Sequence, residues 1–271
     1  MIKKDTRSKI KGYLEGFIQG IINEATKSDF DPRKLRPIRK ASSKGDVKPF
    51  HESLLPDGIL KINEFERSFS TKLGTTFEEC ARLIALDNHK HAQRGYHVKG
   101  KISPKAIERI EEVVNKISSG GMRINYLDLV KEIVELAHDN KGVERVSIAD
   151  LYILTKDGTE IYIEIKSPKP NKGQCLEATQ RLLQIYAILH NKYPKVKAYY
   201  ATAYNPYGID KNTYRHSFVL NYMDINNQVL LGKESWELVG GNGTYEEILR
   251  IYQEVGREKG PDMIDQLALG Y

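Results

Sequence analysis

Apolar side chains recur at intervals of three and one residues over several stretches of the chain, which is the pattern of an amphipathic helix. Residues 4–26 show it first, with an apolar face made of Ile10, Tyr13, Leu14, Phe17, Ile18, Ile21 and Ile22. The same pattern predicts further helices over residues 60–87, 104–118, 126–139, 176–193 and 245–255. Leu73 and Gly74 interrupt the second of these, so we expect a break there.

Two apolar-rich runs near the middle of the chain, residues 148–154 and 159–165, are separated by Lys156-Asp157-Gly158. Asp-Gly between such runs is a strong signal for a β-hairpin. Residues 196–203 are a continuous apolar and aromatic run that suits a buried strand. A helix precedes that run, so the order strand, helix, strand predicts a parallel crossover. Further strands are expected over residues 218–229 and 236–239.

Charged side chains stand where the hairpin strands would meet. Asp150 lies in the first strand, and Glu164 and Lys166 end the second. Side chains alternate along a strand, so Glu164 and Lys166 point the same way, and the hairpin folds Asp150 back beside them. Carboxylates and carbonyls suit Mg²⁺, and a lysine beside them can hold or polarise a water that attacks phosphorus.

Two interpretations of this cluster are equally open on spacing alone. The three residues are either ordinary solvent-facing charges on a half-buried hairpin or a metal site. The apolar context from Tyr162 to Ile165 makes an unpaired carboxylate unfavourable, which favours pairing or metal binding.

The spacing of Asp150 and Glu164-Ile165-Lys166 resembles the PD-(D/E)xK nuclease motif, with Ala149 where that family often has proline. Three further stretches, residues 73–78, 204–208 and 235–245, look like type II restriction endonucleases. Together they are most similar to the TdeIII group. The resemblance covers roughly residues 65–255.

The resemblance implies an α/β restriction-endonuclease-like core with a mixed central β-sheet flanked by helices. It also implies sequence-specific cleavage of double-stranded DNA that leaves a 5′-phosphate and a 3′-hydroxyl. Asp150, Glu164 and the main-chain carbonyl of Ile165 would hold Mg²⁺, and Lys166 would position or activate the attacking water. Glu78 matches a glutamate that many of these enzymes carry near the metal, so it is expected to complete the site. The TdeIII group implies GGNCC as the target and a companion methyltransferase.

Two stretches after the predicted strands carry residue types that contact DNA. Lys169, Lys172 and Gln174 follow the second hairpin strand, where two prolines end it. Asn205, Tyr207 and Arg215 follow the next strand, and amides, aromatics and arginine read base edges. A plain turn and a tyrosine-rich loop are the alternatives for the two stretches. Cutting both strands of a palindrome calls for two sites, so a homodimer is expected.

The composition agrees with a soluble, basic protein. The 271 residues are 40% apolar and 29% charged, with a net charge of +6 and a pI of about 9.0, which favours a polyanionic partner. We expect an N-terminal helix and basic arm over residues 1–60 and a nuclease domain over residues 61–271, as one continuous unit. The basic stretch 29–56 fits both a solvated loop and an arm that tracks phosphates.

Cysteine and histidine spacing argues against a zinc protein. Cys80 and Cys175 belong to no zinc-binding spacing, and reduced thiols in the cytoplasm explain them. His89, His91 and His97 cluster in sequence, but no cysteine or third ligand at a persuasive spacing accompanies the His-x-His pair. No run approaches the roughly 18 apolar residues of a membrane span, and the N-terminus does not match a secretory signal.

Two other functions fit parts of the sequence. A structure-selective or repair nuclease would use the same site without base readout, although the chain carries much more than the motif core. A DNA-binding module with an inactive nuclease site would not require Asp150, Glu164 and Lys166 together.

Overall fold

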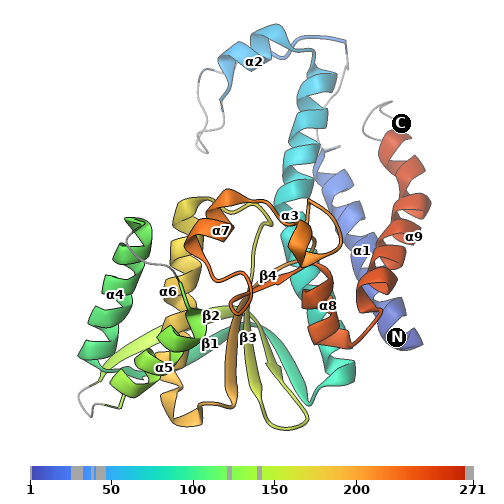
Figure 1. Cartoon of the computed structure of the whole chain (residues 1–271). Helices are drawn as coiled ribbons and strands as arrows, with labels where there is room; N and C mark the ends of the chain where they lie inside the picture. The colour runs from blue at the N-terminus through green and yellow to red at the C-terminus, as the bar shows by residue number, and fades with distance from the viewer. Residues whose placement is uncertain are drawn as a thin grey trace. The chain divides into compact units, whose positions relative to one another are not determined.

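A five-stranded sheet lies in the larger of two units of the computed structural model (Figure 1). The structure describes residues 2–25, 33–37, 40, 47–120, 124–138 and 142–265. The larger unit is formed by Met1–Thr6 and Phe77–Glu247, and the smaller by Arg7–Thr76 and Ile248–Tyr271. The division falls inside helix α3 (Asp57–Asn88). A single long helix therefore contributes to both units.

The sheet has the mixed topology that the sequence predicts. Its strand order is β1-β2-β3-β4-β5, with antiparallel pairing among the first three strands and parallel pairing from β3 to β5. The strands are β1 (His91–Ile102), β2 (Val143–Leu154), β3 (Glu160–Ile165), β4 (Val196–Thr202) and β5 (Val229–Leu231). The predicted hairpin is β2–β3, and Gly158 in its turn has a φ of 86°, which favours glycine. The predicted parallel crossover is also confirmed, because helix α6 (Lys172–Ile188) connects β3 to β4.

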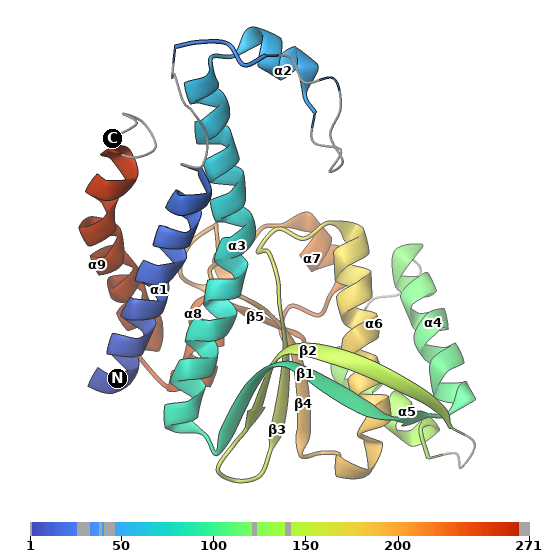
Figure 2. The ribbon, with the colours of Figure 1, turned by 180° about the vertical axis from the view of Figure 1, so that it is seen from behind.

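Helices cover both faces of the sheet (Figure 2). Helices α4 (Pro104–Ser118), α5 (Tyr126–Leu136) and α6 share one core with Tyr152, Tyr162 and Tyr200 of the strands. On the opposite face, Phe77 of α3 and Trp236 of α8 (Lys233–Gly240) approach Leu151 and Ile163. The fold class is therefore confirmed as α/β with a mixed sheet between helical layers.

Helix starts follow local capping signals. The Ser103 hydroxyl accepts a hydrogen bond from the Ala106 amide at 3.1 Å, as the sequence predicts for α4. At the start of α6, Asn171 and Gln174 form a reciprocal capping box. This box begins the helix at Lys172, four residues before the expected position.

The smaller unit is mainly helical in its described part. It contains α2 (Pro49–Leu54) and most of α1 (Lys4–Ala25) and α9 (Thr244–Ile264), together with the first part of α3. Ile10, Leu14 and Ile18 of α1 are buried, which confirms its predicted apolar face. None of the helices in the described part of the chain combines the length and apolar character needed to cross a membrane.

The basic stretch 29–56 is only partly described. Arg36 pairs with Asp57 and, at 2.6 Å, with Glu64, so this cation is engaged within the smaller unit. Arg39 and Lys44 lie outside the described residues. Helix α2 occupies the end of a stretch that the sequence marked as irregular.

Helix α3 is continuous, and the break predicted near Leu73 and Gly74 is wrong. The hydroxyls of Thr75 and Thr76 donate to the carbonyls of Lys72 and Leu73, both at 2.7 Å, and remain compatible with the helix. A single glycine lowers helix stability by only about 1 kcal/mol, which the packing of a long helix outweighs.

Two of the predicted strands are wrong in whole or in part. Residues 236–239 belong to helix α8, where Trp236 and Val239 are buried three positions apart. Residues 218–229 contribute to helix α7 (Ser217–Tyr222) and only reach β5 at their end. Short apolar runs do not distinguish strand from helix, which explains both errors.

Strand β1 was not expected, because only Ala92, Val98 and Ile102 of its 12 residues are buried. The strand also changes face at Gly95, which has a φ of 57°. Arg94 before it pairs with Glu78 of α3, whereas Tyr96 after it stacks on Tyr152 at 4.2 Å, on the α6 side. The regular alternation on which sequence prediction depends is therefore interrupted.

Candidate active site

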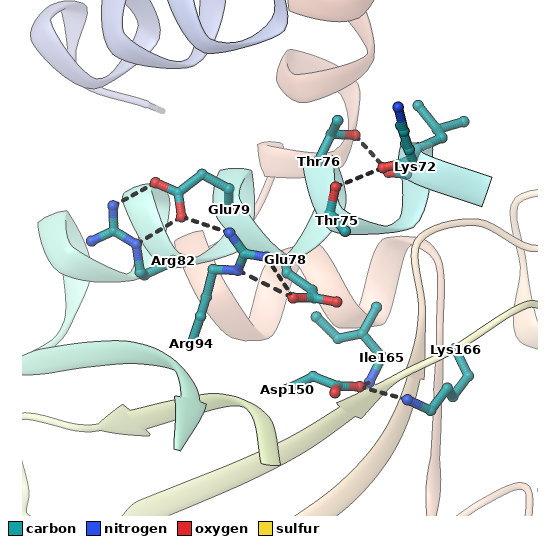
Figure 3. A network of polar contacts seen from close by, with 11 residues as sticks. Lys72, Thr75, Thr76, Glu78, Glu79, Arg82, Arg94, Asp150, Ile165 and Lys166 are labelled. Atoms are coloured by element: carbon teal, nitrogen blue, oxygen red, sulfur yellow. Dashed lines mark hydrogen bonds and ion pairs between the residues drawn. The ribbon is translucent and has the colours of Figure 1, made fainter. Parts of the chain in front are cut away.

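Asp150 and Lys166 meet at the end of β3, as the hairpin predicts (Figure 3). The main-chain pairing of β2 and β3 ends at Leu151 and Ile163, one residue before Asp150. Beyond that point the Asp150 carboxylate replaces the main-chain partner. Its Oδ2 accepts hydrogen bonds from the Ile165 amide at 2.8 Å and from the Lys166 ammonium at 3.1 Å. The side chain of Asp150 is 20% exposed, so solvent reaches it.

Glu164 lies beside this pair in a far more buried position. Its side chain is only 3% exposed, and its Oε1 contacts Lys166 Nζ at 2.9 Å and Arg181 Nη1 at 2.6 Å. Its Oε2 is buried and has no hydrogen-bonding partner among the described residues. Burial raises the pKa of Glu164, and the charge of Asp150 adds to the rise, while Lys166 and Arg181 oppose it.

Lys166 is held as an ammonium between the two carboxylates. Burial alone would lower the pKa of Lys166, but its contacts with Glu164 and Asp150 outweigh burial and raise the pKa. A protonated lysine donates hydrogen bonds and does not accept a proton. The geometry therefore suits the orientation of a water or a phosphate oxygen by Lys166.

The third predicted carboxylate, Glu78, has a different partner. Its Oε2 accepts two hydrogen bonds from Arg94, at 2.8 and 3.1 Å, and Glu79 beside it binds Arg94 and Arg82 (Figure 3). Arg94 pairs across the sheet with Leu151, next to Asp150. Among the residues that the structure describes, no three His, Cys, Asp or Glu side chains form a metal-binding group. Glu78 is thus near the strand that carries Asp150 but is not part of the Asp150–Glu164 pair.

The sequence pattern of the type II restriction endonuclease family HinfI matches residues 3–256. The chain belongs to this family. It is 42% identical over 271 residues to the type II restriction enzymes HgiCII and HgiBI of Herpetosiphon aurantiacus, covering 97% of each chain. It is 27% identical over 223 residues to the type II restriction enzyme MjaII of Methanocaldococcus jannaschii, covering 76% of this chain and 58% of that one.

No solved structure matches the chain. Membership of the HinfI family and the restriction enzymes among its relatives confirm the prediction of a type II restriction endonuclease, which acts on DNA. The finer grouping with TdeIII and the PD-(D/E)xK assignment stay predictions.

Two of the predicted DNA-binding residues of this HinfI-family enzyme lie together at the surface. The Lys169 ammonium stands 5.4 Å from the ring centroid of Tyr207. Both residues are exposed, and Tyr207 packs edge-on against the buried ring of Tyr214. A cation and an aromatic ring are therefore presented next to each other.

The other four predicted DNA contacts have partners within the chain. The Lys172 ammonium donates to the Ser118 main-chain carbonyl at 2.8 Å, and the side-chain Oε1 of Gln174 accepts the main-chain amide of Asn171 at 2.9 Å. Asn205 is 7% exposed, and its amide binds the Asp210 carbonyl and the Thr213 hydroxyl. The Arg215 guanidinium donates to the carbonyls of Asn212 and Tyr214. These contacts hold the first turn of α6 and the loop that follows β4.

The sequence did not reveal Arg181, which binds Glu164 directly. Its only local signal is Glu177 four positions earlier, the spacing of an ordinary helix-surface pair. The contact with Glu164 depends on how α6 packs against β3, and no sequence motif indicates this packing. Arg94, the partner of Glu78, was likewise identified only by the structure.

Proposed function

We propose that the enzyme cleaves both strands of a specific DNA sequence by Mg²⁺-dependent phosphodiester hydrolysis at Asp150, Glu164 and Lys166. The observation that carries this proposal is that the Lys166 ammonium lies 3.1 Å from Asp150 Oδ2 and 2.9 Å from Glu164 Oε1 at the end of β3. Such a cluster matches the needs of phosphoryl chemistry, where a metal and a cation offset negative charge.

The residues present fit a magnesium ion. Asp150 and Glu164 offer carboxylate oxygens, one of them the unpartnered Oε2 of Glu164, and the Ile165 carbonyl is proposed as a third ligand. Oxygen donors of this kind are what Mg²⁺ prefers. When bound, Mg²⁺ would neutralise charge that develops on the scissile phosphate.

Lys166 is proposed to position the attacking water through its ammonium, which already reaches both carboxylates. Glu78 is proposed to complete the site from α3. Its ion pair with Arg94 supports an indirect part, through a water, more than a direct one.

DNA is proposed to run along the loops that follow β3 and β4. Lys169 and Tyr207 offer a phosphate contact and a stacking surface. Lys172, Gln174, Asn205 and Arg215 are proposed to act in DNA binding as well, and their contacts within the chain would hold the start of α6 and the loop after β4 in shape.

A homodimer would give one active site for each strand of a palindromic target. The resemblance to the TdeIII group supports GGNCC as that target, with a companion methyltransferase that protects it.

Digestion of a phage-sized DNA with the pure enzyme and Mg²⁺, followed by sequencing of the fragment ends, tests this function. We expect a fixed set of ends that carry 5′-phosphates and share one short motif, which the sequencing identifies as GGNCC or another site. Random ends would contradict sequence-specific cleavage. Cutting confined to branched DNA would instead favour a structure-selective nuclease.

A further inference from the structure

Arg181 on α6 is the one arginine that contacts the buried carboxylate of the proposed active site in the described part of the chain. We propose that Arg181 is a positioning residue, which holds Glu164 so that its second carboxylate oxygen is presented for catalysis. This inference rests on the active site proposed above. Arg181 lies outside the Asp150 and Glu164-Ile165-Lys166 motif.

The contact is short and involves one oxygen only. Arg181 Nη1 lies 2.6 Å from Glu164 Oε1, and the carboxylate side chain is 3% exposed. The opposite oxygen, Oε2, is buried without a hydrogen-bonding partner among the described residues. Hydrogen bonds to charged groups are strong and directional when they are shielded from water. Arg181 therefore fixes the carboxylate in one orientation and leaves Oε2 available.

Arg181 has a second carboxylate partner on its own helix. Its Nη2 donates to Glu177 Oε1 at 2.6 Å, one helical turn earlier on α6. The Glu177 side chain is 65% exposed, and an exposed pair at this spacing is weak. The strong end of the arrangement is thus the buried end at Glu164.

The two cations that contact Glu164 differ in their exposure and in their other partners. Lys166 also contacts Asp150, and its side chain is 39% exposed at the end of a strand. Arg181 projects from the middle of a helix and forms no hydrogen bond or ion pair with Asp150 among those that the structure describes. If Lys166 turns towards a water, as the proposed function requires, Arg181 still balances the charge of Glu164. Arg181 thereby allows Lys166 to act without leaving a buried carboxylate unpaired.

Single-turnover cleavage of a short duplex by Arg181→Met and Arg181→Lys tests this role. We expect Arg181→Met to slow cleavage by about 10–100-fold, the usual effect of removing a partner that orients a ligand. We expect Arg181→Lys to restore most of the rate, because it keeps a cation. DNA affinity measured with Ca²⁺ should change by less than about threefold, since a positioning residue does not touch DNA.

Arg109→Met is the matched control. Arg109 on α4 has a similar exposed fraction, 23% against 29%, and also bridges two glutamates, Glu132 and Glu112. It lies outside the proposed site, so its loss should leave the cleavage rate unchanged. If Arg181→Met does not fold, Arg181→Gln replaces it with the same expectation.

Unfolding gives a measurement that does not depend on activity. Urea midpoints of the wild type, Arg181→Met, Glu164→Gln and the double variant form a cycle. We expect Arg181→Met to lower the midpoint more in the presence of Glu164 than in its absence. Equal shifts would show that the two side chains do not interact, which would overturn the proposal.

Other results would also overturn it. These are wild-type cleavage by Arg181→Met, a rate for Arg181→Lys as low as that for Arg181→Met, or a loss of DNA affinity that accounts for the slower rate. Asp150→Asn in the same assay distinguishes a failure of the proposed active site from a failure of the role of Arg181. If Asp150→Asn cleaves normally, the proposed site fails; if it is inactive while Arg181→Met is fully active, only the role of Arg181 fails.

Discussion

Two cations and two carboxylates balance one another at the proposed active site. Lys166 and Arg181 face Asp150 and Glu164, and the pKa of Lys166 is raised because the carboxylate contacts outweigh its burial. We therefore propose that Lys166 orients the attacking water as a hydrogen-bond donor.

Lys166→Met should separate metal binding from catalysis. We expect single-turnover cleavage to fall at least about 100-fold, in line with the loss of a hydrogen-bond donor at the reacting atoms. Mg²⁺ binding, measured by calorimetry without DNA, should tighten, because a positive charge within 3.1 Å of both carboxylates is removed. Weaker Mg²⁺ binding would mean that Lys166 organises the carboxylates more than it competes with the metal.

Glu78→Gln should have a smaller effect than Glu164→Gln. Glu78 is paired with Arg94 and stands outside the Asp150–Glu164 pair, so its loss is expected to slow cleavage by about tenfold, near the lower end for a residue that acts through others. Rates of the two variants in the same single-turnover assay check the order. Equal losses would place Glu78 directly at the reacting atoms.

At the scale of elements, the site depends on strands and a helix that the sequence predicts well. The Asp-Gly turn and two apolar runs identified β2 and β3, and side-chain alternation along β3 then brought Asp150, Glu164 and Lys166 together. These signals are local. The apolar runs around α6 and β4 likewise predicted the parallel crossover.

What the sequence missed depends on contacts between elements. Strand β1 buries few side chains and changes face at Gly95, so it has little apolar periodicity. Arg181 reaches Glu164 only because α6 packs on the sheet. Gln174 is a different case, since Asn171 three positions earlier is a readable signature of a capping box.

Gly74→Ala tests the finding that α3 is unbroken. A methyl group at Gly74 would meet no atom within 4 Å, and helical alanine is favoured over glycine. We expect the free energy of unfolding in urea to rise by about 0.5–1 kcal/mol. A loss of stability would indicate that the chain needs glycine at this position, as at a break.

Asp157→Asn tests the turn between β2 and β3. Hydrogen bonds from the hydroxyls of Thr155 and Thr159 lower the pKa of Asp157 to about 2, below its usual range. Because the folded pKa is the lower one, the stabilisation is complete above the ordinary pKa near 4 and is lost as the pH falls towards 2. Asparagine retains the preference for the turn but removes the charge.

Urea midpoints of Asp157→Asn and the wild type at pH 7, 5 and 3 measure this effect. We expect the variant to be slightly less stable at pH 7 and 5, with the difference narrowing at pH 3. A difference that stays constant from pH 7 to pH 3 would show that the charge of Asp157 contributes nothing to the turn.

At the scale of the whole molecule, the proposed homodimer has a direct consequence for cleavage. Each protomer carries one set of Asp150, Glu164 and Lys166, and a duplex has two strands to cut. Mixed dimers of wild-type and Asp150→Asn protomers, each with a different affinity tag for isolation, should therefore nick supercoiled plasmid and accumulate open circles. Linear product at the wild-type rate would contradict one active site per strand.

The most direct test of the active site is Asp150→Asn itself. Asparagine has nearly the same shape, and its carbonyl oxygen can still accept the Ile165 amide that Asp150 binds at 2.8 Å. The matched control is Asp128→Asn, at the exposed start of α5. We would measure single-turnover cleavage of a cognate duplex with Mg²⁺ and DNA affinity without metal. Our assignment predicts that Asp150→Asn loses at least about 100-fold in rate, keeps its DNA affinity and unfolds like the wild type. Cleavage by Asp150→Asn at the rate of the Asp128→Asn control would show that the chemistry takes place elsewhere in the molecule.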